Sequence, residues 1–129
     1  MPNVTARIPT DEAHQDIINL VNELGIPQHL KGYNYIIYSV HTLMSHLNDP
    51  DYGITKGLYP TVGAIFNSTG SRVERAIRHA IDHLFLVGDW ELIQEYFGNS
   101  INSSKGKLTN SQFLYALAYK VHRDRLEHS

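Results

Sequence analysis

Residues 58–82 read LYPTVGAIFNSTGSRVERAIRHAID, and this stretch predicts two helices joined by a tight turn. Pro60 suits the first position of a helix, because the N–H that it lacks would have no intrahelical partner there. Asn67 tolerates the left-handed backbone that a tight turn requires. Gly63 is the small residue that two closely crossing helices need inside the first of them. The pattern therefore predicts a helix-turn-helix over about residues 60–87.

The second of these helices divides into an apolar face and a basic face. At about 100° per residue, the apolar side chains gather on one side: Val73, Ile77, Ala80, Ile81 and Leu84. The other side carries Arg72, Arg75, Arg78, His79, Asp82 and His83. Such a face can simply be solvated, and Glu74 can pair along the helix with Arg78, four residues further on. However, arginine pairs bidentately with guanine and glutamate accepts a hydrogen bond from cytosine, so this mixture is what base reading would use.

Positive charge is concentrated in this part of a chain whose formal net charge is −2. Within residues 54–79, Lys56 and three arginines oppose a single glutamate, which gives +3 and leaves −5 for the rest of the chain. The overall balance argues weakly against nucleic acid, because DNA-binding domains are often basic. The segregation of the charge instead favours a local surface for a polyanion.

The remaining sequence also follows the helical period, without the alternation or the hairpin turns of β-strands. The predicted helices cover about residues 10–24 with Thr10 as N-cap, 33–47, 60–66, 70–87, 90–97 capped by Asp89, and 110–125 capped by Thr109 or Asn110. Residues 54–60 are predicted as a short helical turn and the polar residues 98–110 as a loop. We therefore expect an all-α fold of about six helices in one compact domain, residues 1–129, with a flexible N-terminus at residues 1–9.

Composition excludes several other classes of protein. No apolar run approaches the length of a membrane span, and the N-terminus lacks the apolar core of a signal peptide, so we expect a cytoplasmic protein. Without cysteine the chain forms neither disulfides nor thiolate zinc sites. No phosphate-binding glycine loop, nucleophile elbow or clustered acid pair supports an enzyme, and we expect no cofactor. His79 and His83 have the spacing of metal ligands but no third ligand, so a metal-dependent helical enzyme is a weaker alternative.

The motif SRVERAIRHAI (residues 71–81), with LGIPQHLKGYNYI, ITKGLYP, KLTNSQF and the closing RLEH, resembles the DNA-binding effector domain of the sporulation transcription factor A family. Members of this family are the response regulators of two-component systems that commit endospore-forming bacteria to sporulate. The resemblance covers roughly residues 17–128. It implies an all-helical transcription regulator that binds double-stranded DNA through the major groove, as a head-to-tail dimer on tandem boxes near TGTCGAA.

The resemblance also implies a role for individual side chains of the second helix. Arg72, Glu74 and Arg75 would face the bases, and Arg78 and His79 would lie close to the DNA, although His79 could equally be a surface residue without a role. Contacts to phosphate would set the register of the domain on the duplex. We expect the following residues to lie near the DNA backbone: Lys56, Ser68, Ser71, Arg78 and His79. Arg75→Ala should then collapse specificity, whereas Lys105→Ala should at most weaken binding evenly across sequences.

Two features depart from the family pattern. Ala64 and Ile65 stand where the family usually carries lysines, and the loss of two positive charges should weaken non-specific binding and its salt dependence. Gly63 and Gly70 stand where alanine is usual, which should loosen the pair of helices slightly. The receiver domain that normally precedes this domain is not in the sequence, so we expect either one domain of a longer protein or a stand-alone effector.

The segment DWELIQEYFG (residues 89–98) combines Asp89, Glu91 and Glu95 with Trp90 and Tyr96 and has no positive charge. Beside a DNA-reading helix, Glu91, Glu95 and Tyr96 form a candidate contact with the sigma subunit of RNA polymerase. A solvated helix would have the same composition. For the whole chain, the main alternative is a helical protein-interaction module that retains the fold but has lost DNA binding.

Overall fold

The computed structural model describes residues 12–98, 101 and 108–127. These contain six α-helices and one π-helical segment: α2 Glu12–Leu24, α3 Lys31–Met44, η1 Ile54–Leu58, α4 Tyr59–Ile65, α5 Gly70–Val87, α6 Trp90–Phe97 and α7 Asn110–Glu127. No β-strand occurs in the described residues, which confirms the predicted all-α fold. Thr10, Lys105, the predicted flexible N-terminus and most of the predicted loop lie outside the described residues.

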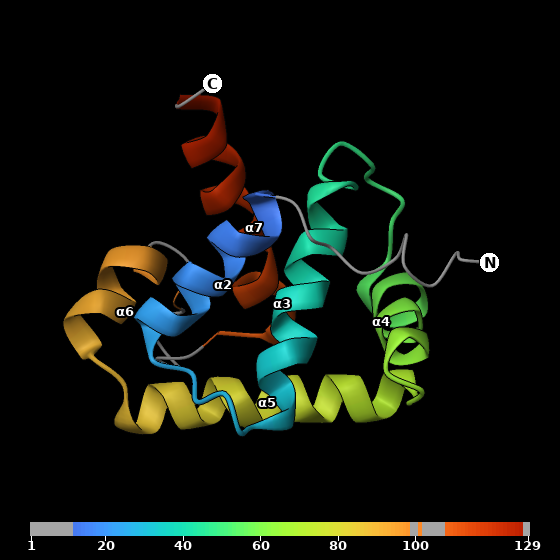
Figure 1. The fold of residues 1–129 in the computed structure, drawn as a ribbon, viewed down its shortest axis with the longest axis horizontal. Coiled ribbons are helices and arrows are strands. Elements are labelled where there is room, and N and C mark those ends of the chain that lie inside the picture. The colour runs from blue at the N-terminus through green and yellow to red at the C-terminus, as the bar shows by residue number, and fades with distance from the viewer. Residues whose placement is uncertain (1–11, 99–100, 102–107, 128–129) are drawn as a thin grey trace.

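The helices are arranged around α5, which runs along the bottom of the molecule in Figure 1. α3 descends onto the middle of α5, α4 stands at its N-terminal end, and α6 follows its C-terminal end. α2 and α7 lie beside α3. The apolar faces of α3, α5 and α7 meet in the core, where Val40, Ile77 and Phe113 are completely buried. One side of α5 therefore faces the core and the other remains on the surface.

The close crossing of α3 over α5 depends on Gly32. A Cβ at this position would collide with the carbonyl oxygen of Ala76 and would lie 2.8 Å from the Cβ of Ala80. The absence of a side chain thus lets the two backbones approach. As a result, Lys31 at the start of α3 lies next to the exposed side of α5.

Local signals place several helix ends where the sequence predicts them. α5 and α6 have the predicted bounds, and the side chain of Asp89 accepts hydrogen bonds of 3.0 and 3.3 Å from two N–H groups in the first turn of α6. Gly25, with φ of +93°, follows the last residue of α2. Before α7, Thr109 and Gln112 exchange hydrogen bonds of 2.9 and 3.1 Å between side chain and backbone, which is a capping box. Thr109 is therefore the cap, and Asn110 is the first helical residue.

α3 differs from its prediction at both ends. It begins two residues earlier and ends three residues earlier than predicted, at Lys31 and Met44. The chain tightens after Met44, because the N–H groups of Ser45 and His46 bond to carbonyl oxygens three residues back, at 3.1 and 2.8 Å. Such bonds end an α-helix even where an apolar residue, here Leu47, continues the periodic pattern.

The segment before α4 is a π-helical turn rather than an ordinary turn of helix. The N–H of Leu58 bonds to the carbonyl oxygen of Gly53, five residues back, at 3.0 Å. The chain passes directly from this turn into α4. For this reason α4 begins at Tyr59 and ends at Ile65, one residue earlier at each end than predicted.

Candidate nucleic-acid interface

The turn between α4 and α5 packs directly against α4. Asn67 has φ of +55°, the left-handed conformation that the sequence predicts. The N–H of Ser68 bonds to the carbonyl oxygen of Gly63 at 2.7 Å, and a Cβ on Gly63 would lie 3.0 Å from the carbonyl carbon of Thr69. The side chain of Thr69 then caps α5 by accepting a hydrogen bond of 3.2 Å from the N–H of Arg72. This geometry is consistent with the predicted helix-turn-helix.

The two faces of α5 are those that its sequence predicts. Each side chain of the apolar face is at most 1% exposed: Val73, Ile77, Ala80, Ile81 and Leu84. The opposite side, which we call the α5 ridge, consists of five exposed residues: Ser71, Arg72, Glu74, Arg75 and His79. No ion pair or side-chain hydrogen bond among the described residues uses the guanidinium group of Arg72 or Arg75. Both groups are therefore available to a ligand.

A groove of about 940 Å³ borders the α5 ridge on the side of α3. Its walls come from the start of α3, from the turn before α5 and from α5 itself. The side chains in its lining that carry or can acquire positive charge are His29, Lys31, Arg72, Arg75 and His79. Ser68, which the sequence predicts near the DNA backbone, also lines this groove, which we call the α3 groove. Positive charge in such a groove suits an anionic chain such as a phosphodiester backbone.

His29 and Lys31 are candidate binding residues that the sequence interpretation missed. Lys31 is the first residue of α3, and the first turn of that helix has no acidic residue. A cation at a helix N-terminus opposes the helix dipole. This mismatch between residue and position is the signal in the sequence that could have indicated a negatively charged ligand.

A second groove, of about 620 Å³, borders the other side of the α5 ridge. It lies between η1, α5 and the start of α7, and we call it the α7 groove. Arg75 lines both grooves, whereas Lys56 is exposed on η1 and lines neither. A ridge between two grooves has the shape needed to enter the major groove, with the two DNA strands on either side.

Arg78 differs from the two free arginines, because groups within the protein hold it. Its Nη1 donates to the carbonyl oxygen of Leu108 at 2.8 Å, and its Nε donates to Asp82 at 3.1 Å. The ion pair with Asp82 measures 2.9 Å. The carboxylate partner is thus Asp82, four residues further along α5, and not Glu74.

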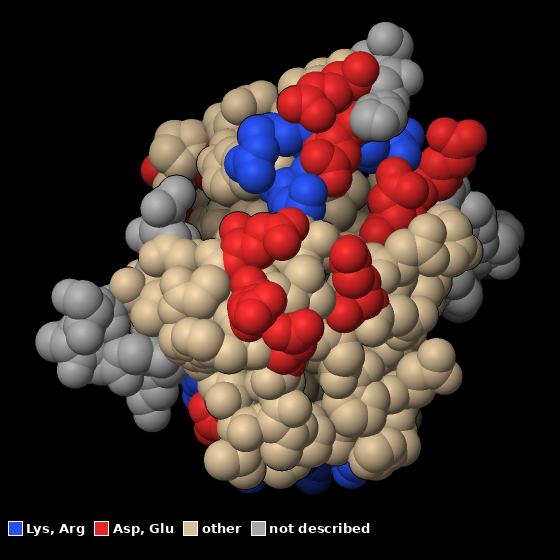
Figure 2. Space-filling model, turned by 90° about the vertical axis from the view of Figure 1, so that its left-hand side faces the viewer, with Lys and Arg blue, Asp and Glu red and all other residues tan. Residues whose placement is uncertain are grey.

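An acidic surface lies on a different face from the α5 ridge. Figure 2 shows acidic side chains gathered in the middle of the face that includes α6, with lysine and arginine side chains directly above them and others at the lower edge, where α5 runs. Glu91 and Glu95 of the predicted polymerase contact are exposed. At the end of α5 and the start of α6, Leu86 is 82% exposed and Trp90 is 50% exposed. Trp90 is therefore the more accessible aromatic side chain of α6.

Tyr96, the third residue of the predicted polymerase contact, takes part in contacts between helices. Its hydroxyl group donates to Glu23 of α2 at 2.8 Å, and the Nζ of Lys120 of α7 lies 5.1 Å from the centre of its ring. Burial, followed by the hydrogen bond to Glu23 and the charge of that residue, raises the pKa of Tyr96 to about 12. The side chain thus connects α6 to both of its neighbours.

Neither a metal cluster nor a membrane-spanning helix occurs in the part of the chain that the structure describes. Around His79 and His83, no third histidine or carboxylate within these residues completes a group that could hold a metal ion. None of the described helices combines the length and the apolar character that a bilayer span needs.

A comparison with known protein families matches residues 17–121 to the family described as Sporulation initiation factor Spo0A C terminal. The matched residues contain α4, α5 and the residues that line both grooves. The match confirms the resemblance carried by SRVERAIRHAI, and this family is one of DNA-binding transcription regulators rather than enzymes. Since the match covers most of the chain, the protein belongs to the family of Spo0A C-terminal domains of sporulation initiation factors.

Proposed function

We propose that this domain binds double-stranded DNA in a sequence-specific manner, with the α5 ridge in the major groove. The observation that carries this proposal is the pair of exposed, unpaired guanidinium groups of Arg72 and Arg75 on a ridge between two grooves. Family membership supports the same function. Regulation of transcription then follows from the DNA sites that the domain selects.

Base reading is assigned to Arg72, Glu74 and Arg75. Arginine can donate two hydrogen bonds to O6 and N7 of guanine, and glutamate can accept one from N4 of cytosine. Each good bidentate contact discriminates against the wrong base by about 1–3 kcal/mol. Since Thr69 caps the first turn of α5, the backbone that carries these side chains is well defined.

Contacts to the phosphates are assigned to residues around the α5 ridge. Ser68, Ser71 and His79 come from the helix pair α4–α5, and Lys56 comes from η1. To these we add His29 and Lys31, because they line the α3 groove together with Arg72 and Arg75. Such contacts hold the protein in register but carry no sequence information of their own. Arg78 lies near the DNA in this arrangement, although its guanidinium group already has partners in the protein.

The target proposed from the family resemblance is a pair of tandem boxes near TGTCGAA. Two domains would occupy the boxes in head-to-tail order, because a direct repeat presents each copy with a site in the same orientation. Such a contact between copies is heterologous, and the number of boxes limits the length of the assembly.

The acidic surface of α6 is proposed as a contact with the sigma subunit of RNA polymerase. Glu91 and Glu95 supply exposed negative charge, and Tyr96 and Trp90 supply aromatic area. Glu91→Lys and Glu95→Lys should lower activation in a promoter–reporter assay while DNA binding is retained. Unchanged activation with intact DNA binding would end this part of the proposal.

The proposed function is tested by fluorescence anisotropy with a labelled duplex that carries two tandem TGTCGAA boxes. A scrambled duplex of the same length and composition serves as the control, and both are titrated at two salt concentrations. We expect tighter binding to the boxes, and weaker binding to both duplexes as salt rises, because phosphate contacts release counterions. Equal affinity for both duplexes at both salt concentrations would instead favour a protein-interaction module.

A further inference from the structure

Asn110, the first residue of α7, joins both helices of the pair α4–α5 through one side-chain amide. Its Nδ2 donates to the backbone carbonyl oxygen of Glu74 in α5 at 3.0 Å. The same nitrogen donates to the hydroxyl oxygen of Tyr59, the first residue of α4, at 3.2 Å. The amide thus fixes the start of α7 against the two helices whose relative position matters for DNA reading.

The chemistry of this contact requires a carboxamide. The carbonyl oxygen of Glu74 can only accept a hydrogen bond, so the side chain must offer an N–H donor, which an amide has and a carboxylate lacks. Tyr59 is only 3% exposed, and Asn110 is partly buried. Burial raises the pKa of Tyr59, and the hydrogen bond from Asn110 acts in the opposite direction. Loss of the two donors would therefore remove the polar link from the start of α7 to the backbone of α5 and to the hydroxyl group of Tyr59.

Arg78 makes a second connection one turn further along α5. Its Nη1 donates to the carbonyl oxygen of Leu108 at 2.8 Å, and the side chain of Leu108 is 1% exposed in the core. The short segment from Leu108 to Asn110 is therefore held to α5 by two polar connections and anchored by one buried side chain. Both connections lie on the half of α5 that carries Arg72 and Arg75.

Directional bonds at Glu74 and Arg78 restrict rotation of α5 about its own axis. Apolar packing alone restricts such rotation less, because hydrophobic burial is non-directional, whereas a hydrogen bond weakens steeply as its angle departs from linearity. The guanidinium groups of Arg72 and Arg75 lie at the ends of long side chains, so a small rotation of the helix displaces them by more than it displaces the backbone. Contacts to bases tolerate little displacement, because their geometry must be held within about 0.5 Å.

We propose that Asn110 is a positioning residue for DNA reading, supported by Arg78. Together they hold α5 at the rotation at which the α5 ridge meets the base edges. The inference rests on the proposed function, and it assigns to the start of α7 a role in specificity without contact to a base. It also gives Arg78 a role within the protein rather than one at the phosphates.

The test compares Asn110→Asp with Ser111→Asp in the intact chain. Both variants add one negative charge in the first turn of α7, where the helix dipole favours it, so α7 should remain folded in both. Only Asn110→Asp removes the donors to Glu74 and Tyr59. Each protein is titrated by anisotropy with the box duplex and the scrambled duplex, and its thermal unfolding is recorded. Backbone amide shifts of Glu74 and Arg75 in the free protein provide a readout without DNA.

We expect Asn110→Asp to lower the box-to-scrambled affinity ratio by about fivefold or more, a change within the range of one bidentate base contact. The amide shifts of Glu74 and Arg75 should also move in this variant. Ser111→Asp should weaken binding to both duplexes equally and keep the ratio. A folded Asn110→Asp variant with the wild-type ratio would overturn the inference, as would an equal fall of the ratio in Ser111→Asp. If Asn110→Asp does not fold at the assay temperature, uncharged Asn110→Ala is judged by the same ratio.

Failure of the proposed function is distinguishable from failure of this inference. If the wild-type protein itself prefers neither duplex, the proposed function is wrong, and the role of Asn110 in specificity is overturned with it. If the wild type prefers the boxes and Asn110→Asp does so equally, the function stands and only the inference about Asn110 is overturned.

Discussion

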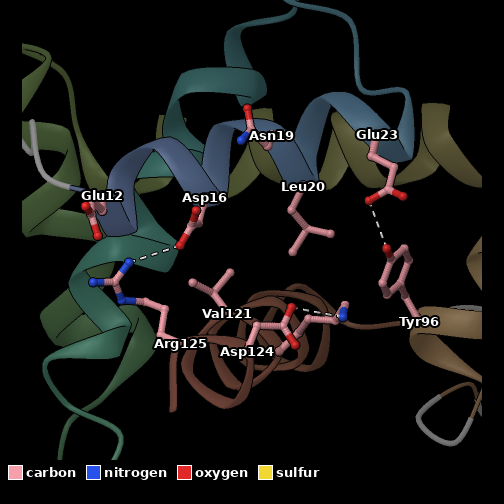
Figure 3. A pocket seen from close by; sticks show the side chains of 10 residues that line it. Glu12, Asp16, Asn19, Leu20, Glu23, Tyr96, Val121, Asp124 and Arg125 are labelled. Atoms are coloured by element: carbon pink, nitrogen blue, oxygen red, sulfur yellow. Dashed lines mark hydrogen bonds and ion pairs between the residues drawn. The ribbon is translucent and has the colours of Figure 1, made fainter. Parts of the chain in front are cut away.

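The α5 ridge borders two grooves, and the cleft between α2, α6 and α7 is itself a hollow. Both carry charged side chains, but these side chains differ in whether they are paired within the protein. In the cleft, of about 530 Å³, Arg125 pairs with Asp16 at 3.0 Å and Lys120 pairs with Asp124 at 3.1 Å. Figure 3 shows Arg125 and Tyr96 pointing across the cleft toward carboxylates of α2. On the α5 ridge, by contrast, no ion pair among the described residues engages Arg72 or Arg75.

This difference indicates that the availability of charge, rather than its amount, separates a binding surface from a stabilising one. A guanidinium group that already has a carboxylate partner must break that pair before it binds a ligand. An exposed and unpaired group needs only to lose water. The cleft therefore connects helices, whereas the guanidinium groups of the α5 ridge are available to an anionic ligand.

The largest effect is expected from Arg75→Ala, which removes a free guanidinium group from the α5 ridge. The box-to-scrambled affinity ratio should fall by about 10- to 100-fold, because one bidentate base contact is worth about 1–3 kcal/mol. Anisotropy titrations with the two duplexes measure this ratio. Arg123→Ala, an exposed arginine of α7 that lines neither groove beside α5, is the matched control and should keep the ratio. A wild-type ratio in Arg75→Ala would show that the assignment of base reading is wrong.

A smaller effect is expected from Lys31→Gln, which removes one charge from the α3 groove. Affinity for both duplexes should fall evenly, and the slope of log affinity against log salt should become shallower by about 1. Titrations over a series of salt concentrations give the slope. Lys120→Gln is the control from the cleft, since Lys120 already pairs with Asp124. An unchanged slope in Lys31→Gln would exclude a phosphate contact at this position.

Asp16→Asn should have a still smaller effect, and on stability alone. Asp16 and Arg125 have side chains that are 48% and 38% exposed, and exposed ion pairs contribute only about 0–1 kcal/mol. Urea unfolding should therefore show a free energy of unfolding lowered by no more than that amount. Binding to both duplexes should be unchanged. If Asp16→Asn altered the box-to-scrambled ratio, the cleft would not be the purely stabilising region described above.

An effect that is absent at neutral pH concerns Tyr96 and appears only at high pH. The pKa of Tyr96 is raised from 10.0 to about 12 in the folded protein, so the folded state holds the hydroxyl proton more tightly than the unfolded state. Its contribution to stability is thus complete below pH 10 and is lost as pH rises from 10 to 12. In Tyr96→Phe, the free energy of unfolding should fall less steeply over this range. Tyr119→Phe, at a residue that is 43% exposed, should behave as wild type. Identical pH profiles for Tyr96→Phe and wild type would contradict the prediction.

Several elements could be predicted because short-range signals determine them. The bounds of α5 and α6 follow from residues at the helix ends, since Asp89 bonds to N–H groups only two and three residues away. The left-handed turn at Asn67 follows from the residue itself. The apolar face of α5 follows from helical periodicity, because every turn presents the same side to the core.

Other features depend on partners that are distant in sequence. Arg78 bonds to a carbonyl oxygen 30 residues away, and Tyr96 bonds to a carboxylate 73 residues away. Periodicity places such side chains on a face of a helix but does not say what lies opposite. The sequence therefore does not reveal that Arg78 and Tyr96 also have partners within the protein. That His29 and Lys31 lie beside the α5 ridge is hidden in the sequence for the same reason.

The sequence by itself determined the all-α fold, the family and the side of α5 that carries Arg72, Glu74 and Arg75. These depend on residue type, on helical spacing and on caps that act over a few residues. Only the tertiary structure decided which cations are free and which are paired, and which groove each one lines. That distinction arises because Gly32 lets α3 approach α5, and because the start of α7 engages Arg78 but leaves Arg75 in solvent. The charge of a side chain is local, but its availability depends on everything that the fold brings beside it.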